Sequence, residues 1–509
     1  MQPEDQALSK ALALIERTRH RLKQIDGSAY PTDETKIARE LLLASLERLG
    51  LPENWRSRSP KTNQPSVSPQ ALYRALIDFQ DFVTTVEASN LERISWPVVN
   101  YCRELWAALF PNTEEKGPRL FYSTQSRHNY SIGSFDEHLG QLLRPVLGSR
   151  EEVAAFFQET PLHGTALFCL RIPLIEDQNL PLYASIGHEF GHAFLKSHRA
   201  DFNKLWEEEF VDFGIKIGKK VPTGMPVKER FVQVLESFAE EIFCDRVGAA
   251  ISGPAFLLSL QEMLWGSDPE LWQVNLRPEL SDITAYPGDA FRIECLREAE
   301  SLQSLPQFIT DVRNCLAHEL PQQLPLGLPG QAASFDLMLL DELFAVTPAK
   351  SSSERVEVVP AGDSDAALFR DIFRSVLPNN IPPKTVLSEL RDTLRRFAKR
   401  CETELLSPIR GKFLPLRAED IASLLVRLHH SVLPNIVPDG TLRGVPAQFS
   451  TILNASAIYR ACLLSQRHAD DGPEAIDRQL QKTERLTSKA LEVTYLQHDY
   501  NRSIPKQQP

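Results

Sequence analysis

The residues best suited to chemistry in this sequence are the two histidines and the glutamate of the segment His188-Glu189-Phe190-Gly191-His192. Residues four apart lie on the same face of an α-helix, about one turn from each other. Both imidazoles can therefore reach one metal ion. Glu189 follows the first histidine, where it can reach a water molecule bound to that ion. This HExxH pattern predicts two ligands of a zinc ion and a general base.

A catalytic zinc site needs a third protein ligand and an open position for water. A second predicted helix, from about 227 to 250, carries Glu241-Ile-Phe-Cys-Asp245, in which two carboxylates lie one turn apart. Glu241 can bind the metal, and Asp245 can accept the second N–H of a ligand histidine, which fixes the tautomer of that histidine. Glu240 is a rival third ligand, because the sequence alone does not decide which neighbour points inward. The four-residue step to Asp245 favours Glu241.

Two further residues near the motif are weaker candidates. Glu236 lies four residues before Glu240, and because like charges repel at this spacing, both are expected to face solvent. His198 occupies the third-histidine position of the longer HExxHxxGxxH pattern. That pattern needs a glycine at which the chain turns back to the metal, and Leu195 stands there. We therefore expect the helix to continue and to carry His198 away from the ion.

The two motifs together, HEFGH followed by EIFCD, resemble the gluzincin group of zinc peptidases, whose pattern is HExxH followed by ExxxD. The resemblance covers about residues 118 to 300, and the part that carries motifs is two helices. It implies one Zn²⁺ ion with the following residues around it: His188, His192 and Glu241 as ligands, Glu189 as general base and proton shuttle, and Asp245 as the partner of a ligand histidine.

The mechanism that this resemblance implies is peptide hydrolysis by a zinc-activated water molecule. Glu189 would take the proton of the water and deliver it to the leaving amine. The oxyanion needs a donor in addition to the metal. Tyr286 and Arg292 are candidates, because they follow the second helix where the chain could fold over the cleft. The alternatives are a packed aromatic ring for Tyr286 and a structural salt bridge for Arg292.

The remaining sequence predicts an α+β protein that is predominantly α-helical. A zincin-like catalytic domain, with a small β-sheet and two metal-binding helices, is expected between N- and C-terminal helical regions. The expected divisions are an N-terminal helical region (1–117), a metallopeptidase domain (118–305), a Pro/Ser-rich connecting region (306–365) and a C-terminal helical domain of about five helices (366–509).

Short apolar runs rich in aromatic and β-branched residues predict the strands. They lie at 120–124, 130–135 and 165–173, and Val356 could begin another. The run at 165–173 enters directly before the HExxH helix, and in zinc peptidases a strand in that place pairs with an extended substrate. Residues 278 to 287 are expected to form a loop.

Composition excludes several classes of function. A net charge of −11 argues against a nucleic-acid scaffold, and the basic stretch Arg391–Arg400 is typical of a solvated helix face. Seven cysteines without a CxxC pair favour free thiols in a reducing compartment. The N-terminal residues lack the apolar run of a signal peptide, so none is expected, and no apolar run has the length of a membrane span. The expected location is the cytoplasm, with no membrane or nucleic-acid partner.

These observations predict a zinc-dependent endopeptidase that cleaves a specific intracellular protein or peptide substrate. The helical flanks would restrict access, which suggests a regulatory or defence-related role. One alternative is a catalytically inactive zincin-like protein that acts as a helical interaction module. Another is a zinc amidase that acts on a small molecule. Recognition of a peptide by the strand at 165–173 would separate the peptidase from the amidase.

Overall fold

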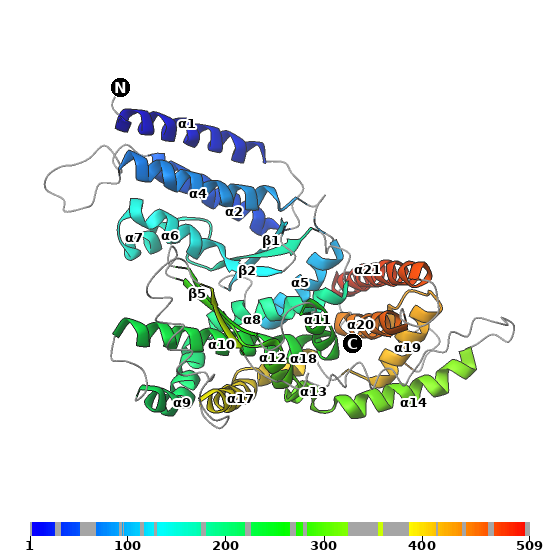
Figure 1. The fold of residues 1–509 in the computed structure, drawn as a ribbon. Helices are drawn as coiled ribbons and strands as arrows, with labels where there is room; N and C mark the ends of the chain where they lie inside the picture. The colour runs from blue at the N-terminus through cyan, green and yellow to red at the C-terminus, as the bar shows by residue number, and fades with distance from the viewer. Residues whose placement is uncertain are drawn as a thin grey trace, which may run out of the picture. The chain divides into compact units, whose positions relative to one another are not determined.

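The fold is known from a computed structural model, which describes residues 3–25, 32–50, 68–90, 94, 96–111, 117–126, 130–174, 180–218, 225–264, 271–277, 282–323, 355–359, 386–413, 416–439, 444–466 and 473–503. The chain forms two compact units, Met1–Gln178 and Asn179–Pro509. Helices predominate and the sheets are small (Figure 1), so the predicted α+β, mostly helical class is confirmed. The boundary between the units falls inside the stretch expected as one metallopeptidase domain.

The helices of the first unit are α1 (Pro3–Gln24), α2 (Asp33–Gly50), α4 (Pro69–Glu87), α5 (Trp96–Leu109), α6 (Phe135–Leu147) and α7 (Arg150–Glu159). The last two are separated by Gly148 and Ser149. Gly148 ends α6 with a φ of 107°, a conformation that L side chains rarely adopt. Ser149 and Glu152 then form a reciprocal capping box that starts α7.

The first unit contains a three-stranded sheet of β1 (Arg119–Gln125), β2 (Ser131–Ser134) and β3 (Leu167–Pro173), in the order β1-β3-β2. The central strand β3 runs parallel to β1 and antiparallel to β2. Phe121, Leu167 and Cys169 lie on one face of the sheet and belong to the hydrophobic core that the surrounding helices share. Alternate residues of a strand point to the same face, which explains this spacing.

The position of β3 corrects one expectation. The sequence predicts that the 165–173 strand pairs with an extended substrate, which requires a free strand edge. In the structure β1 and β2 occupy both edges of β3, so this prediction is wrong. The strands at the edges of this sheet are β1 and β2.

The second unit begins with a short 3-10 helix, η1 (Leu180–Ser185), and the HExxH helix starts directly after it, at Ile186. Its helices are α8 (Ile186–Ser197), α9 (Arg199–Gly218), α10 (Met225–Ser252), α11 (Pro254–Met263), α12 (Asp289–Arg297), α13 (Glu300–Gln303), α14 (Leu305–Gln323), α17 (Val386–Glu404), α18 (Ser407–Phe413), α19 (Ala418–His429), α20 (Phe449–Gln466) and α21 (Pro473–Ser503).

The long helix α10 is the centre of the second unit. From Glu241 to Ser252 every residue of α10 is buried. A helix that is buried all round lies in the interior of its domain, with neighbours on each side. Its neighbours include α8, α12, α17 and β5. The carboxylates of the second motif therefore lie in the interior of the unit.

A second small sheet has the order β5-β4-β6, formed by β4 (Leu271–Arg277), β5 (Asp282–Tyr286) and β6 (Arg355–Val359). The expected loop at 278–287 is wrong for residues 282–286, which pair antiparallel with β4. The strand predicted at Val356 is confirmed and pairs parallel with β4. A two-stranded pair, β7 (Ile436–Val437) and β8 (Val445–Pro446), lies between α19 and α20.

Beyond residue 386, the described part of the chain contains five helices. The first part of the expected C-terminal domain, residues 366–385, lies outside the described residues. All seven cysteines are free thiols, in agreement with their spacing. Within the described ranges, no helix has the length and apolar composition that a bilayer crossing requires.

The basic stretch on α17 is less solvated than expected. Its arginines form ion pairs with acidic residues of other helices: Arg391 and Arg395 with Glu294 of α12, and Arg396 and Arg400 with Glu209 of α9. The positive charge of this face is therefore balanced within the unit.

Candidate metal centre

The candidate site depends on an unusually close contact between α8 and α10. A Cβ atom on Gly191 would lie 2.8 Å from Cα of Cys244, and one on Gly187 would lie 3.1 Å from Cα of Gly248. Because the neighbouring atoms belong to the backbone, they could not move aside as a side chain would. The two glycines thus allow the helix backbones to approach closely, and this approach brings the histidines of α8 to the carboxylates of α10.

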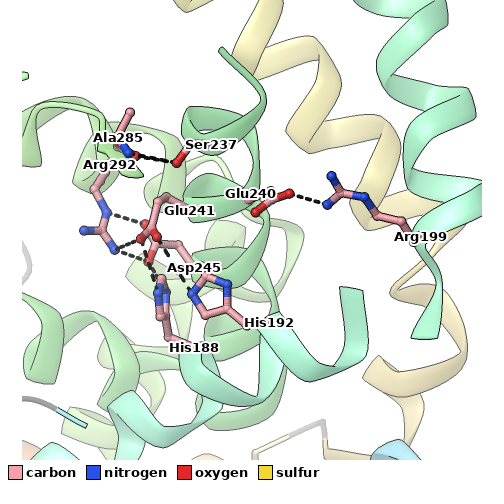
Figure 2. Close-up of polar contacts among 9 residues, drawn as sticks. All are labelled: His188, His192, Arg199, Ser237, Glu240, Glu241, Asp245, Ala285 and Arg292. Carbon is pink, nitrogen blue, oxygen red and sulfur yellow. Dashed lines mark hydrogen bonds and ion pairs between the residues drawn. The ribbon is translucent and has the colours of Figure 1, made fainter. Parts of the chain in front are cut away.

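His188, His192 and Glu241 converge at this contact (Figure 2). The Nε2 atom of His188 lies 3.4 Å from Oε2 of Glu241, and Nε2 of His192 lies 3.8 Å from Oε1. All three ligand atoms lie within 4.8 Å of one another. Among the described residues this is the single group of three or more such side chains that could hold a metal ion. The structure therefore shows a candidate metal centre at the predicted residues.

The three side chains differ in exposure, which gives the centre an open side. The side chains of His188 and Glu241 are 12% and 11% exposed, whereas that of His192 is 31% exposed. Two ligands are thus held in the interior, and the third lies where solvent or a ligand can approach. A catalytic metal site needs such an accessible position, whereas a structural site is closed.

Asp245 fixes the orientation of His188. Its Oδ1 lies 2.8 Å from Nδ1 of His188. Because an ionised carboxylate can only accept hydrogen bonds, Nδ1 must carry the hydrogen and donate it. A metal ion would bind at the other nitrogen, Nε2, which faces Glu241, in place of the proton there.

Arg292 of α12 completes this buried group. Its Nε and Nη2 atoms donate hydrogen bonds of 2.8 Å to the two oxygens of Asp245, and Nη2 lies 3.7 Å from Glu241. The guanidinium is 9% exposed. The alternative expectation for Arg292, a structural salt bridge, describes this contact, and the guanidinium is engaged with the carboxylates behind the ligands.

The pKa values reflect this pairing of charges. Burial opposes ionisation of Asp245, but Arg292 and His188 outweigh it and lower the pKa of Asp245 to about 2. Burial likewise opposes protonation of His188, yet the hydrogen bonds to Asp245 and Glu241 raise its pKa to about 10. His192 has a lowered pKa, because burial is the largest effect there. Asp245 and Glu241 are therefore kept in their charged form by Arg292 and His188, and this pairing balances their negative charge.

The structure decides between Glu240 and Glu241. Glu240 binds Arg199, at the start of α9, and Figure 2 shows it directed toward that residue and away from the two histidines. Arg199 also binds Glu236. The expectation that both glutamates face solvent is wrong, because their side chains are 27% and 23% exposed and share one guanidinium. An intervening cation removes the repulsion on which that expectation rested.

His198 is not part of the candidate centre. It is the C-cap residue of α8, where the helix ends rather than continues as expected. Its ring stacks on Phe194 at 4.0 Å, and its Nδ1 lies 3.0 Å from the carbonyl oxygen of Phe194. These local contacts hold the imidazole on its own helix.

The other predicted residues lie on neighbouring elements. Glu189 is on α8 between the two histidines and is half-buried. Tyr286 ends β5 and is 37% exposed. The residue before it, Ala285, is bonded through both its N–H and its C=O to the hydroxyl of Ser237. Ser237 lies one turn before Glu241, so this bond attaches the end of β5 to the helix that carries the carboxylates (Figure 2).

Reasoning from the sequence missed Arg199, Ser237 and the role of the two glycines. Glycines spaced four apart within a helix, as at 187 and 191, are a detectable signal of close helix contact. Arg199 and Ser237 carry no such signal, because their partners lie 37 or more residues away.

Comparison of this chain with protein families, with curated proteins and with solved structures finds no match.

Proposed function

We propose that this protein is a zinc-dependent endopeptidase of the gluzincin type, with a zincin-like catalytic core, that cleaves a specific intracellular protein. The observation that carries the proposal is the meeting of His188, His192 and Glu241 around one point, with Asp245 behind His188. The free cysteines support a reducing location.

The donor set fits zinc. Two imidazole nitrogens and one carboxylate oxygen are ligands that zinc accepts, and three protein ligands leave a fourth position for water. A tetrahedral ion with bonds of about 2.0–2.1 Å keeps its ligand atoms about 3.3–3.4 Å apart. The distance of 3.4 Å between Nε2 of His188 and Oε2 of Glu241 agrees with this geometry. Nε2 of His192 lies 3.8 Å from the other oxygen, Oε1, and the three ligand atoms lie within 4.8 Å of one another.

When bound, zinc would lower the pKa of a water molecule and polarise the scissile carbonyl. Glu189 would accept the proton from this water and deliver it to the leaving amine. Asp245 would keep Nδ1 of His188 protonated and its Nε2 directed to the ion. Arg292 would hold Asp245 and Glu241 in place, and Tyr286, exposed at the end of β5, would be the oxyanion donor.

The test compares the wild type with Glu189→Gln, and with Glu207→Gln on an exposed position of α9 as the control. Bound zinc is measured in each purified protein, and cleavage is followed by mass spectrometry of a cell lysate. We expect one zinc per chain in all three, with new cleavage products from the wild type and the control. Loss of Glu189 should lower the rate by about 10²–10⁴-fold.

Two other outcomes would overturn the proposal. Absence of stoichiometric zinc from the wild type would remove the metal hypothesis. Zinc in every variant without any peptide cleavage would favour an interaction module, or an amidase if small amides are hydrolysed instead.

A further inference from the structure

The contact between α8 and α10 follows one regular alignment. Gly187 lies against Gly248, Gly191 lies against Cys244, and Arg199 binds Glu236. From the first to the second of these contacts, the position advances by four residues on α8 and goes back by four on α10. From the second to the third, it advances by eight residues into α9 and goes back by eight on α10. The two segments are therefore antiparallel and in register along this line, with a contact at the same helical face on each occasion.

The same register places the metal ligands. His188 bonds to Asp245, and four residues later His192 lies beside Glu241, four residues earlier on α10. A displacement of α10 by one turn would put Asp245 beside His192 and Ala249 beside His188. The centre would then lose a carboxylate at the first histidine, so its ligand set depends on the alignment of the helices.

The glycine contacts do not by themselves exclude that displacement. It would place Gly191 against Gly248, and two glycines tolerate close approach as well as the observed pairs do. Small residues repeated every four positions allow contact at more than one alignment. The alignment of the two helices must therefore be fixed elsewhere along the contact, by a side chain that can bind at one position only.

Arg199 has such partners. Its guanidinium binds Glu240 through Nη1 (Figure 2). It binds Glu236 through Nη2. The guanidinium also lies over the ring of Phe202, with its Cζ atom 5.5 Å from the ring centroid. Phe202 is fully buried. A guanidinium that spans two carboxylates one turn apart fits a single position along the helix, and a lysine could not reproduce this geometry.

From these contacts we infer that Arg199 is a positioning residue of the metal centre, which sets the alignment of α8 on α10 and holds Glu240 away from the ion. The inference rests on the proposed zinc site. Arg199 touches none of the ligands, and ion pairs with this much exposure (41% for Arg199) contribute little to stability. Its loss should therefore affect metal binding much more than folding.

The test compares Arg199→Ala and Arg199→Lys with Arg400→Ala. Arg400 is a matched control: it is 32% exposed and binds Glu208, Glu209 and Glu404, none of which lies on α10. Zinc affinity is measured by competition with a chelator, and thermal unfolding is measured on the metal-free proteins. We expect Arg199→Ala to weaken zinc binding at least tenfold, Arg199→Lys to show an intermediate loss, and Arg400→Ala to match the wild type. The melting temperatures of the two alanine variants should be similar.

Hydrogen exchange of the metal-free proteins tests the alignment without zinc. Faster exchange of α8 amides in Arg199→Ala than in Arg400→Ala supports the inference. Equal zinc affinity and equal exchange in the two alanine variants would overturn it. A wild type that binds no zinc would overturn the proposed function instead, and the exchange measurement would still decide the role of Arg199.

Discussion

Asp245 and Arg246 are neighbours on α10, and both are 1% exposed. Each forms a buried ion pair, in which α10 supplies the acidic residue in one case and the basic residue in the other. Asp245 accepts two hydrogen bonds from Arg292 and one from His188. Arg246 donates to Glu402 of α17. The other oxygen of Glu402 accepts from the backbone N–H of Glu300 at the start of α13. The two pairs are alike in burial and in charge, but they differ in the side chains to which they are connected.

The difference shows that burial of charge does not by itself identify a functional site. The Arg246–Glu402 pair links three helices, and both of its side chains stay within the interior. The Asp245–Arg292 pair continues through His188 and Glu241 to His192, which is 31% exposed. A buried charge network that reaches an accessible, metal-binding side chain can act on a ligand, whereas a closed pair stabilises packing.

The largest effect should come from Glu241→Ala, which removes a proposed zinc ligand from the open network. We expect zinc affinity to fall by more than about 100-fold, because even the outer hydrogen-bond partners of metal sites contribute 10–100-fold. Glu240→Ala is the neighbouring control and should keep one zinc per chain, measured by atomic emission. Retention of zinc by Glu241→Ala would show that the network does not end in a metal site.

Arg246→Met should act on the closed pair alone. Glu402 would be left as a buried charge without its partner, so we expect a loss of about 3–5 kcal/mol in the free energy of unfolding, measured with urea. The double variant Arg246→Met with Glu402→Leu should recover most of this loss, because an apolar pair replaces the charges. If zinc affinity of the still-folded single variant fell as well, the separation of the two networks would be refuted.

Asp245→Asn is the corresponding change in the open network. An amide can still contact His188, but it no longer provides the charge that fixes the tautomer and the basicity of the imidazole. Zinc affinity should fall by about 10–100-fold, measured by chelator competition on protein whose near-ultraviolet circular dichroism is unchanged. An affinity equal to that of the wild type would place Asp245 with Arg246, as a packing residue.

The smallest effects should come from the glycines. Gly191→Ala places a Cβ 2.8 Å from the backbone of Cys244, so α8 and α10 must separate, at a cost of about 1–3 kcal/mol. Gly411 of α18 has no atom within 4 Å of such a Cβ, so Gly411→Ala should instead raise the stability by up to about 1 kcal/mol. Urea unfolding measures the stability of both variants. If both substitutions changed the free energy of unfolding in the same direction, the close contact at Gly191 would be contradicted.

Much of the candidate site could be predicted from local spacing. The step from His188 to His192 and the step from Glu241 to Asp245 both place two side chains on one helix face, and this geometry needs no knowledge of the rest of the chain. The substrate-binding role of β3 could not be predicted correctly, because whether a strand is internal depends on where β1 and β2 pair with it.

The sequence by itself determined which residues along two helices could bind a metal ion, because helical periodicity is a local property. Only the tertiary structure decided that Glu241 rather than Glu240 faces the histidines, that His198 stays on its own helix, and that Arg292 binds Asp245. These outcomes depend on how α8, α10 and α12 are rotated and aligned against one another. That arrangement is fixed by contacts between residues distant in the sequence, such as Gly191 with Cys244.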